Sequence, residues 1–544
     1  MKKIIKNILI TASFTAAATC FWAEESKIEL PDLTTVVTSE QTDIEEIAVP
    51  DFADVVNAPE NSGHLVLEMP DVEVLEKSDV VVTVKSANNK QVYVEGQAGG
   101  GYPASFLGSF TVSRITGNDP FKVEFYHSSE NGYAQKDLSS GYFDRDTNIS
   151  LDKTFSWNAF KLDLNGFYES SGVGLQSAEP DILAINQNKL NGSAAFNWEI
   201  GNGFNLGTKL GLDYYFRFAD LDIGASCDSF IKHASVFAIN PSIYGNWSND
   251  SFAAELSGSV WMDGDLQSAF DSGHQYSNRG LINLTGNWNY NKLNVYGNVG
   301  FVLGDNLNSN KIIVPFGLGV STSFPVYYSD RNVVLLAEAG LKPDRNTNGE
   351  LENLYKYSAL NVLPSETSNW FANLNISVPL KTEFTGDLGL TFKNTAFENG
   401  VWEPVYKASG YQSGIYTYQQ NEKTVFATDI GVTYRHGIFA GTLKWHANWK
   451  DVPVLEDRHD FYVDLSFQDP DVKWGVNLNS EITLDGADKI PVVNLESFAG
   501  ITPQVKLVLQ AEDVLKFFDS QPRIYGGKYI TDSGNLKLLV KFLY

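Results

Sequence analysis

The sequence has 544 residues, and its 40 lysines and arginines are outnumbered by 66 aspartates and glutamates, which gives a formal net charge of −26. This balance argues against nucleic acid as a partner, because nucleic-acid binding relies on basic patches. Two cysteines cannot supply a disulfide framework, and no segment reaches the roughly 18 consecutive apolar residues of a transmembrane helix.

Residues 1–23 are typical of a secretory signal peptide. Three lysines precede the largely apolar run 8–18, which is too short to span a bilayer as a helix. Cleavage fits after Ala18, before Cys20 or after Ala23, and the cysteine also leaves a lipoprotein open as an alternative. We therefore expect export, and the strand pattern further along the chain has to distinguish a periplasmic protein from an outer-membrane one.

Residues 24–90 form an acidic segment that contains prolines, with 16 aspartates and glutamates against 4 lysines. So much charge and so few aromatic residues predict a flexible periplasmic segment rather than a folded core. Three related Pro-Asp motifs begin at Leu30, Val49 and Met69. Short extended peptides of this kind suit pairing with the sheet of a periplasmic protein partner.

From residue 91 onward, apolar and polar residues alternate, as in strands with one apolar face. In the clearest case, 206–218, Leu, Thr, Tyr and Phe alternate with Gly, Lys, Asp, Tyr and Arg. This row is longer than an ordinary strand and can cross a bilayer when tilted. Similar rows occur at 160–169, 282–290, 293–301, 426–434 and 461–467. The polar rows place five charged residues on a predicted lumen wall: Lys161, Asp163, Lys209, Asp213 and Arg217.

The connections between these rows alternate in length. Short turns are expected near 117–118, 158, 202–203, 249–250, 291 and 437, and long loops near 129–146, 171–187, 219–233, 264–280, 342–366 and 395–422. Outer-membrane barrels have short periplasmic turns and long external loops. The pattern therefore predicts an all-β fold, a transmembrane antiparallel β-barrel of about 22 strands (18–22) over residues 91–544, in contact with outer-membrane lipid.

The last ten residues, Asn535–Tyr544, form the predicted closing strand. Five apolar residues occupy one face, and Lys537 and Lys541 lie on the other. A closed barrel pairs its last strand with its first, whereas a soluble sandwich, the alternative, leaves such a strand as an edge. The ending resembles the closing strand of bacterial outer-membrane barrels. This resemblance implies that Phe542 and Tyr544 serve as a signal for the barrel assembly machinery.

The strand number, the C-terminal hairpin and one N-terminal motif together resemble TonB-dependent receptors. Residues 505–515 look like the penultimate strand, and Lys516-Phe517-Phe518-Asp519 is similar to the turn that follows it in that family. Near the N-terminus, Thr34-Thr35-Val36-Val37-Thr38 looks like a TonB box, the motif that pairs with a periplasmic partner. An ordinary linker is the alternative for this run.

The chain departs from that family in one respect. Only about fifty residues separate the TonB-box-like run from residue 91, and they are acidic and poor in glycine. A folded plug domain does not fit there. The resemblance therefore implies a plugless relative in the outer membrane of a diderm bacterium, for which energised transport is an open question.

The sequence offers no pattern of catalytic, metal or cofactor residues, so we expect neither enzymatic activity nor a cofactor. One predicted external loop is rich in aromatic residues that suit contact with a ligand, namely Trp402, Tyr406, Tyr411, Tyr416 and Tyr418. Two functions follow. The first is a solute channel or receptor whose solute is unspecified. The alternative is a membrane-anchored barrel whose N-terminal segment binds periplasmic proteins without transport.

Overall fold

The computed structural model describes residues 92–115, 119–133, 136–178, 181–222, 224–266, 273–304, 312–327, 329–364, 366–395, 400–406, 415–453, 456–484, 490–518, 522–525, 528–531 and 534–544. The predicted signal peptide, the acidic segment 24–90, the run 34–38 and Tyr411 lie outside these residues.

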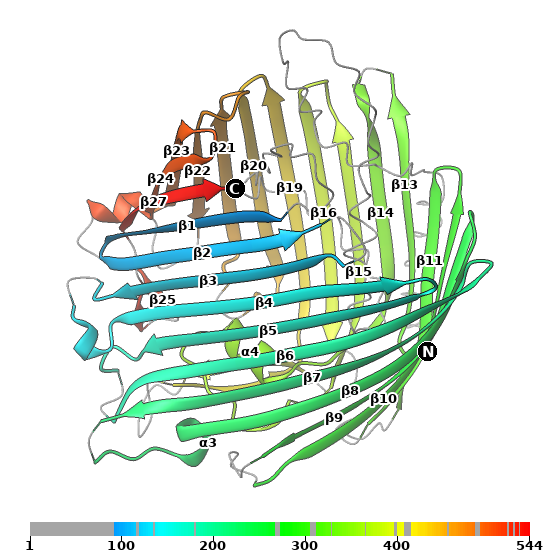
Figure 1. The fold of residues 1–544 in the computed structure, drawn as a ribbon, viewed down its shortest axis with the longest axis horizontal. Coiled ribbons are helices and arrows are strands. Elements are labelled where there is room, and N and C mark those ends of the chain that lie inside the picture. Colours follow the sequence, from blue (N-terminus) through cyan, green and yellow to red (C-terminus); the bar gives the residue numbers. More distant parts are fainter. Residues whose placement is uncertain are drawn as a thin grey trace.

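One sheet of 23 strands runs through the described chain. Its strand β12 has only two residues, and the other 22 strands form a closed antiparallel barrel (Figure 1). Each of these strands pairs with the next barrel strand along the chain, and β27 pairs back with β1. The structure thus confirms the predicted fold class, and the strand number is even, as antiparallel closure requires.

The barrel strands are β1 (Tyr93–Tyr102), β2 (Ala104–Arg114), β3 (Phe121–Asn131), β4 (Phe143–Trp157), β5 (Phe160–Gly174), β6 (Ile182–Gly201), β7 (Phe204–Leu221), β8 (His233–Ser248), β9 (Phe252–Asp265), β10 (Tyr276–Tyr290), β11 (Leu293–Gly304), β13 (Phe316–Val326), β14 (Ser329–Asp344), β15 (Thr367–Pro379), β16 (Phe384–Thr395), β19 (Thr424–His436), β20 (Phe439–Lys450), β21 (His459–Gln468), β22 (Trp474–Thr483), β23 (Val492–Thr502), β24 (Val505–Glu512) and β27 (Asn535–Leu543). The shorter elements are η1 (Leu138–Ser140), α3 (Ser229–Lys232), β12 (Ile312–Ile313), α4 (Asn348–Leu354), β17 (Val401–Tyr406), β18 (Tyr416–Asn421), η2 (Val514–Phe517), β25 (Ile524–Tyr525) and β26 (Tyr529–Ile530).

The alternation in the sequence becomes the two faces of the barrel. Along β7, Leu210 and Leu212 are about half exposed on the outside, whereas Tyr215 and Arg217 are buried inside. Large apolar side chains with more than a third of their surface exposed recur on strand after strand around the barrel. Such a row in water would be an aggregation hazard, and in a bilayer it is the lipid-contacting belt.

The two ends of the barrel differ. At one end the connections are tight, and Asn158, Asn202 and Asn291 have φ between 52° and 56° in two-residue turns. Asparagine adopts this left-handed conformation more readily than other residues with a Cβ atom. In the described part of the chain, the helices and the short strands all lie in connections at the opposite end, which we call the external end. The predicted alternation of short and long connections is therefore confirmed from β2 onward, whereas the external β1–β2 connection is Pro103 alone.

The predicted penultimate strand is slightly too long. We expected it over 505–515, but β24 ends at Glu512. Asp513 has φ 49° and ψ 51°, a left-handed conformation that breaks the strand and starts η2. Among the described residues, no helix is both long and apolar enough to cross a membrane.

Candidate functional site

Five connections meet over the external end and form a buried cluster, which we call the loop cap. Its core consists of Val173, Leu175, Ile182, Ile185, Phe230, Ile231, Tyr357, Ala359, Ile415, Tyr416 and Tyr529, each no more than 6% exposed. The rings of Tyr357 and Tyr529 stack with their centroids 3.7 Å apart. Gln176 joins two of the connections, because its side chain exchanges two hydrogen bonds with the backbone of Ile530, 2.7 and 2.8 Å long.

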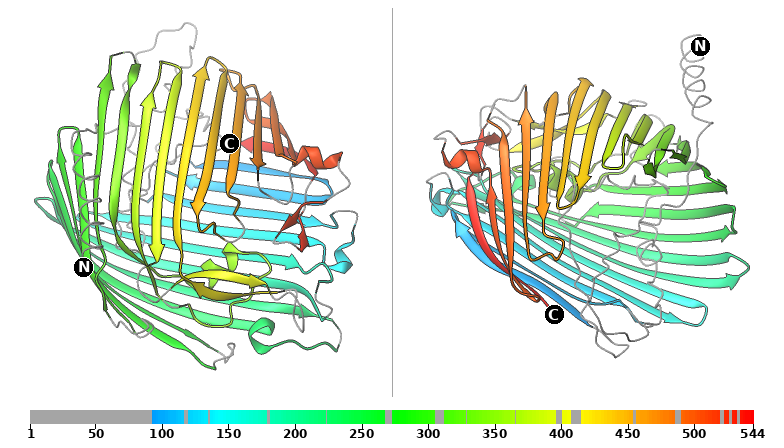
Figure 2. Two further views of the ribbon diagram at one scale, coloured as in Figure 1. Left: turned by 180° about the vertical axis from the view of Figure 1, so that it is seen from behind. Right: turned by 90° about the horizontal axis from the view of Figure 1, so that it is seen from above.

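The β14–β15 loop (residues 345–364 and 366) folds against the inner wall of the barrel. Helix α4 lies within the barrel outline in Figure 1 and in both views of Figure 2. The helix begins with a capping box, in which Thr347 and Glu350 each bind the other's backbone N–H. A Cβ atom on Gly349 would lie 3.1 Å from Tyr215, so this glycine lets α4 approach the wall closely.

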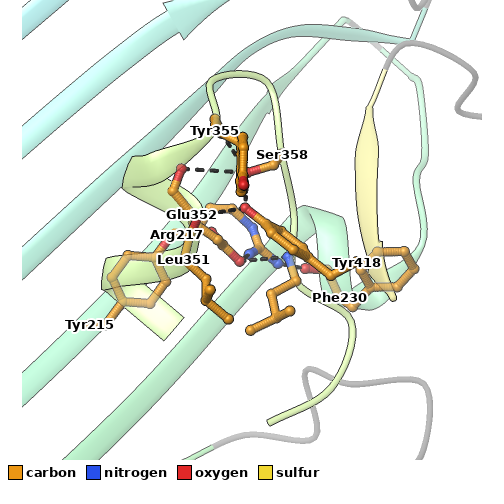
Figure 3. Close-up of polar contacts among 9 residues, drawn as sticks. Tyr215, Arg217, Phe230, Leu351, Glu352, Tyr355, Ser358 and Tyr418 are labelled. Carbon is orange, nitrogen blue, oxygen red and sulfur yellow. Dashed lines mark hydrogen bonds and ion pairs between the residues drawn. The ribbon is translucent and has the colours of Figure 1, made fainter. Parts of the chain in front are cut away.

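A fully buried ion pair joins this loop to the wall. The side chains of Glu352 on α4 and Arg217 on β7 are both 0% exposed (Figure 3). Arg217 donates to Glu352 and to the carbonyl of Phe230, and Tyr215 donates to the other carboxylate oxygen of Glu352. The backbone N–H of Leu360 also donates to Glu352, at 2.6 Å. Three polar groups thereby hold one carboxylate inside the barrel, where charge-assisted hydrogen bonds are strong.

Two further ion pairs hold the ends of the same loop. Arg345 pairs with Asp263 of β9 and lies over the ring of Trp261, 5.1 Å from its centroid. At the other end, Glu366 lies 2.7 Å from Arg279 of β10. Burial raises the pKa of Glu366 above its ordinary value, even though the arginine opposes this. The loop is therefore attached to the wall by charges at its beginning, middle and end.

Strand β18 supports the loop from the other side. The Tyr418 hydroxyl donates to the carbonyl of Leu351 and lies 2.8 Å from the Ser358 hydroxyl, which donates to the carbonyl of Tyr355. Burial raises the pKa of Tyr418 above the ordinary value of tyrosine.

A cavity of about 1360 Å³ lies inside the barrel, lined by the inner faces of the strands, by the β14–β15 loop and by the β17–β18 hairpin. Its lining carries charges of both signs and has nearly no net charge, although the whole chain has −26. Some of these charges neutralise one another, for example Lys393 and Asp344 at 3.2 Å. The charged lining residues are Lys189, Lys209, Arg279, Lys342, Arg345, Lys393 and Lys423, and Asp152, Asp213, Glu255, Asp344, Glu350, Glu403, Asp429 and Glu456.

The structure describes the side chains of three of the five aromatic residues for which we predicted ligand contact. Trp402 lines the cavity. Tyr416 and Tyr418 are 3% and 6% exposed and pack within the loops. Tyr406 ends β17, and Tyr411 lies outside the described residues. Of Trp402, Tyr416 and Tyr418, Trp402 is the one that faces a space able to hold a solute.

Two of the five charged residues predicted to line the lumen, Lys209 and Asp213, line the cavity. Lys161 lies 3.3 Å from Asp163 in an ion pair. Arg217 differs from the expectation of a plain wall residue, because Glu352 and the Phe230 carbonyl enclose it.

Glu352 is the residue that sequence reasoning missed. The start of its helix was readable, since Thr347 and Glu350 have the spacing of a capping box. The pairing of Glu352 with Arg217 could not be predicted, because 135 positions separate the two residues in the sequence. In the described part of the chain, no group of three or more potential ligands is placed to hold a metal ion. The lining of the cavity offers side-chain charges, amides and aromatic rings.

Neither a model of a known protein family nor any curated protein matches the sequence. Solved structures do match the fold. The FrpB iron transporter from Neisseria meningitidis superimposes with a TM-score of 0.58 at 8% identity, over 84% of this chain and 82% of that one. The copper transporter OprC superimposes with a TM-score of 0.61 at 8% identity, over 85% of this chain and 82% of that one. The siderophore receptor PirA from Pseudomonas aeruginosa superimposes with a TM-score of 0.59 at 9% identity, over 85% of this chain and 82% of that one.

The chain has the fold of the TonB-dependent receptors. The predicted resemblance is thereby confirmed for the barrel. At identities of 8–9%, the likeness concerns the fold alone. Together with the lipid-contacting belt, this fold places the protein in the bacterial outer membrane. The three matched proteins are named as transporters or receptors.

Proposed function

We propose that this barrel is an outer-membrane receptor or channel that admits a polar solute into its lumenal cavity. The observation that carries the proposal is the cavity itself, which has about 1360 Å³ and seven basic and eight acidic lining residues. An anchor without transport would need no such space. A lining with almost no net charge, in a chain with a large negative charge, suits a neutral or zwitterionic solute.

One side of the cavity combines apolar and aromatic surface. Leu354 at the end of α4 is 63% exposed, and it lines the cavity together with Tyr355 and Trp402. Beside them lies the ion pair between Lys423 and Glu403. Rigid rings next to charged groups can hold a solute with both an apolar and a polar face. This surface is where we expect the ligand contact that was predicted for the aromatic loop.

Filling the cavity should reduce solute passage. Ser257 lies on β9 and lines the cavity, so Ser257→Trp places a large ring in the lumen. We expect single-barrel conductance and solute-driven liposome swelling to fall at least about twofold. The matched control is Leu256→Trp, because the neighbouring residue points toward the lipid and is 58% exposed.

Barrels that neither conduct ions in planar bilayers nor admit any member of a panel of small sugars and amino acids, whether the β14–β15 loop is docked or released, would favour the anchor alternative. Equal effects of the Ser257 and Leu256 substitutions would show that the cavity is not the path.

The TonB-box-like run gives a separate prediction. If Thr34–Thr38 pairs as a strand with a periplasmic partner, Val36→Pro should abolish solute uptake in cells, because proline removes a hydrogen-bond donor from the ladder. Ala53→Pro, in the same acidic segment but outside the run, serves as the control. Heat-modifiable barrel should be equally abundant in both variants. Unchanged uptake in Val36→Pro would leave the segment as a tether.

A further inference from the structure

We propose that the β14–β15 loop is a removable plug of the barrel and that the Arg217–Glu352 ion pair is its latch. This inference goes beyond passage through the lumen, because it assigns the closure to the chain's own external loop. It rests on the proposed function only for the consequence that opening the latch raises conductance.

Helix α4 has the contacts of a docked segment, although Tyr357 and Ala359 further along the loop belong to the core of the loop cap. The apolar cluster around α4 is small, with Leu351, Leu360 and Tyr418 as its buried members. The attachments of the loop to the wall include ion pairs to three different strands, through Arg217 on β7, Asp263 on β9 and Arg279 on β10. Since charges can be rehydrated, such contacts can be exchanged for contacts with water when the loop leaves.

The interface also leaves polar atoms without protein partners. Among the described residues, both amide atoms of Asn348 and the Nε atoms of Arg217 and Arg345 are buried and make no hydrogen bond to protein. Asn348 is 2% exposed. Buried polar groups of this kind call for bridging water. A hydrated interface carries less penalty for separation than a dry one, which fits a segment that docks and releases.

Glu352 holds the central place in this arrangement. Its carboxylate is the shared acceptor of Arg217, Tyr215 and the Leu360 N–H. Arg217 at the same time donates to Phe230 in α3, so one arginine connects the wall, the β14–β15 loop and the β7–β8 loop. Removing the carboxylate leaves a buried arginine without a counter-charge, and Arg217 can then become solvated only if the loop moves away from β7.

The first experiment measures the loop directly. Hydrogen exchange of the refolded full-length barrel in detergent, followed by mass spectrometry, should show the peptides over 345–364 protected in the wild type. In Glu352→Ala we expect their exchange to be at least about tenfold faster. The matched control is Glu338→Gln, a change in a wall carboxylate of β14 that binds Tyr296 and Asn373 rather than the loop. It should leave the exchange of these peptides unchanged.

Arg217→Met is the second variant, and it should also speed exchange, because it leaves Glu352 buried without its partner. The heat-dependent shift in gel mobility confirms for each variant that the barrel itself has formed. Unchanged exchange in both folded variants would overturn the latch.

Conductance separates this inference from the proposed function. If both hold, Glu352→Ala should raise the KCl conductance in planar bilayers several-fold, and cells that carry it should become sensitive to vancomycin, which the outer membrane otherwise excludes. Faster exchange without any conductance would support the latch and overturn the proposed passage. Slow exchange with normal wild-type conductance would overturn the latch and leave the passage standing.

Discussion

Deleting Phe542–Tyr544 is expected to abolish barrel assembly. Phe542 pairs with Val505 of β24 and with Gly96 of β1. Tyr544 exchanges two backbone hydrogen bonds with Val94, 2.7 and 2.8 Å long. The deletion removes these pairings on both sides of β27, and in lipid each backbone group left unpaired costs several kcal/mol.

The measurement is the amount of heat-modifiable barrel in the outer membrane, which should fall to background while periplasmic degradation products rise. A double variant, Phe542→Leu with Tyr544→Leu, keeps the backbone ladder and removes only the aromatic rings. Assembly of the double variant but not of the truncation would assign the effect to strand pairing. If neither the double variant nor the truncation assembles, the effect belongs to the aromatic signal. Normal barrel from the truncation would show that β27 does not close the sheet.

Much of this barrel could be predicted because the information is local. The row 206–218 places its apolar residues on one face whatever its neighbours are, and it became β7 with the expected side outward. Turn residues are similarly local, as Asn158 and Asn202 show. Once alternation and turns are known, antiparallel closure leaves little freedom in the strand order.

The arrangement inside the barrel could not be predicted in the same way. Trp402 and Tyr418 belong to one aromatic-rich stretch, yet the first lines the cavity and the second packs within the loops. Arg217 and Glu352 have no pattern that connects them, because their contact depends on how a long loop folds back against a distant strand. Such contacts depend on packing and desolvation in the assembled structure, and the alternation of apolar and polar residues does not predict them.

The glycines of β1 give the second large expected effect, at the seam where the barrel closes. A Cβ atom on Gly101 would collide with the backbone carbonyl of Leu536 in β27, and one on Gly99 with that of Leu538. Neither carbonyl belongs to a flexible side chain, so the two strands would have to move apart. Gly101→Val should therefore weaken the β1–β27 pairing and lower the stability of the barrel by about 1–3 kcal/mol.

Gly166→Val is the control, because a Cβ atom on Gly166 would meet nothing within 4 Å. We expect urea unfolding followed by gel mobility to show an earlier transition and less assembled barrel for Gly101→Val. Because valine is favoured in strands when space allows, Gly166→Val should be neutral or slightly stabilising. Equal unfolding midpoints for the two valine variants would mean that the seam has room for a side chain, and the close approach of β1 to β27 would then not be what closes this barrel.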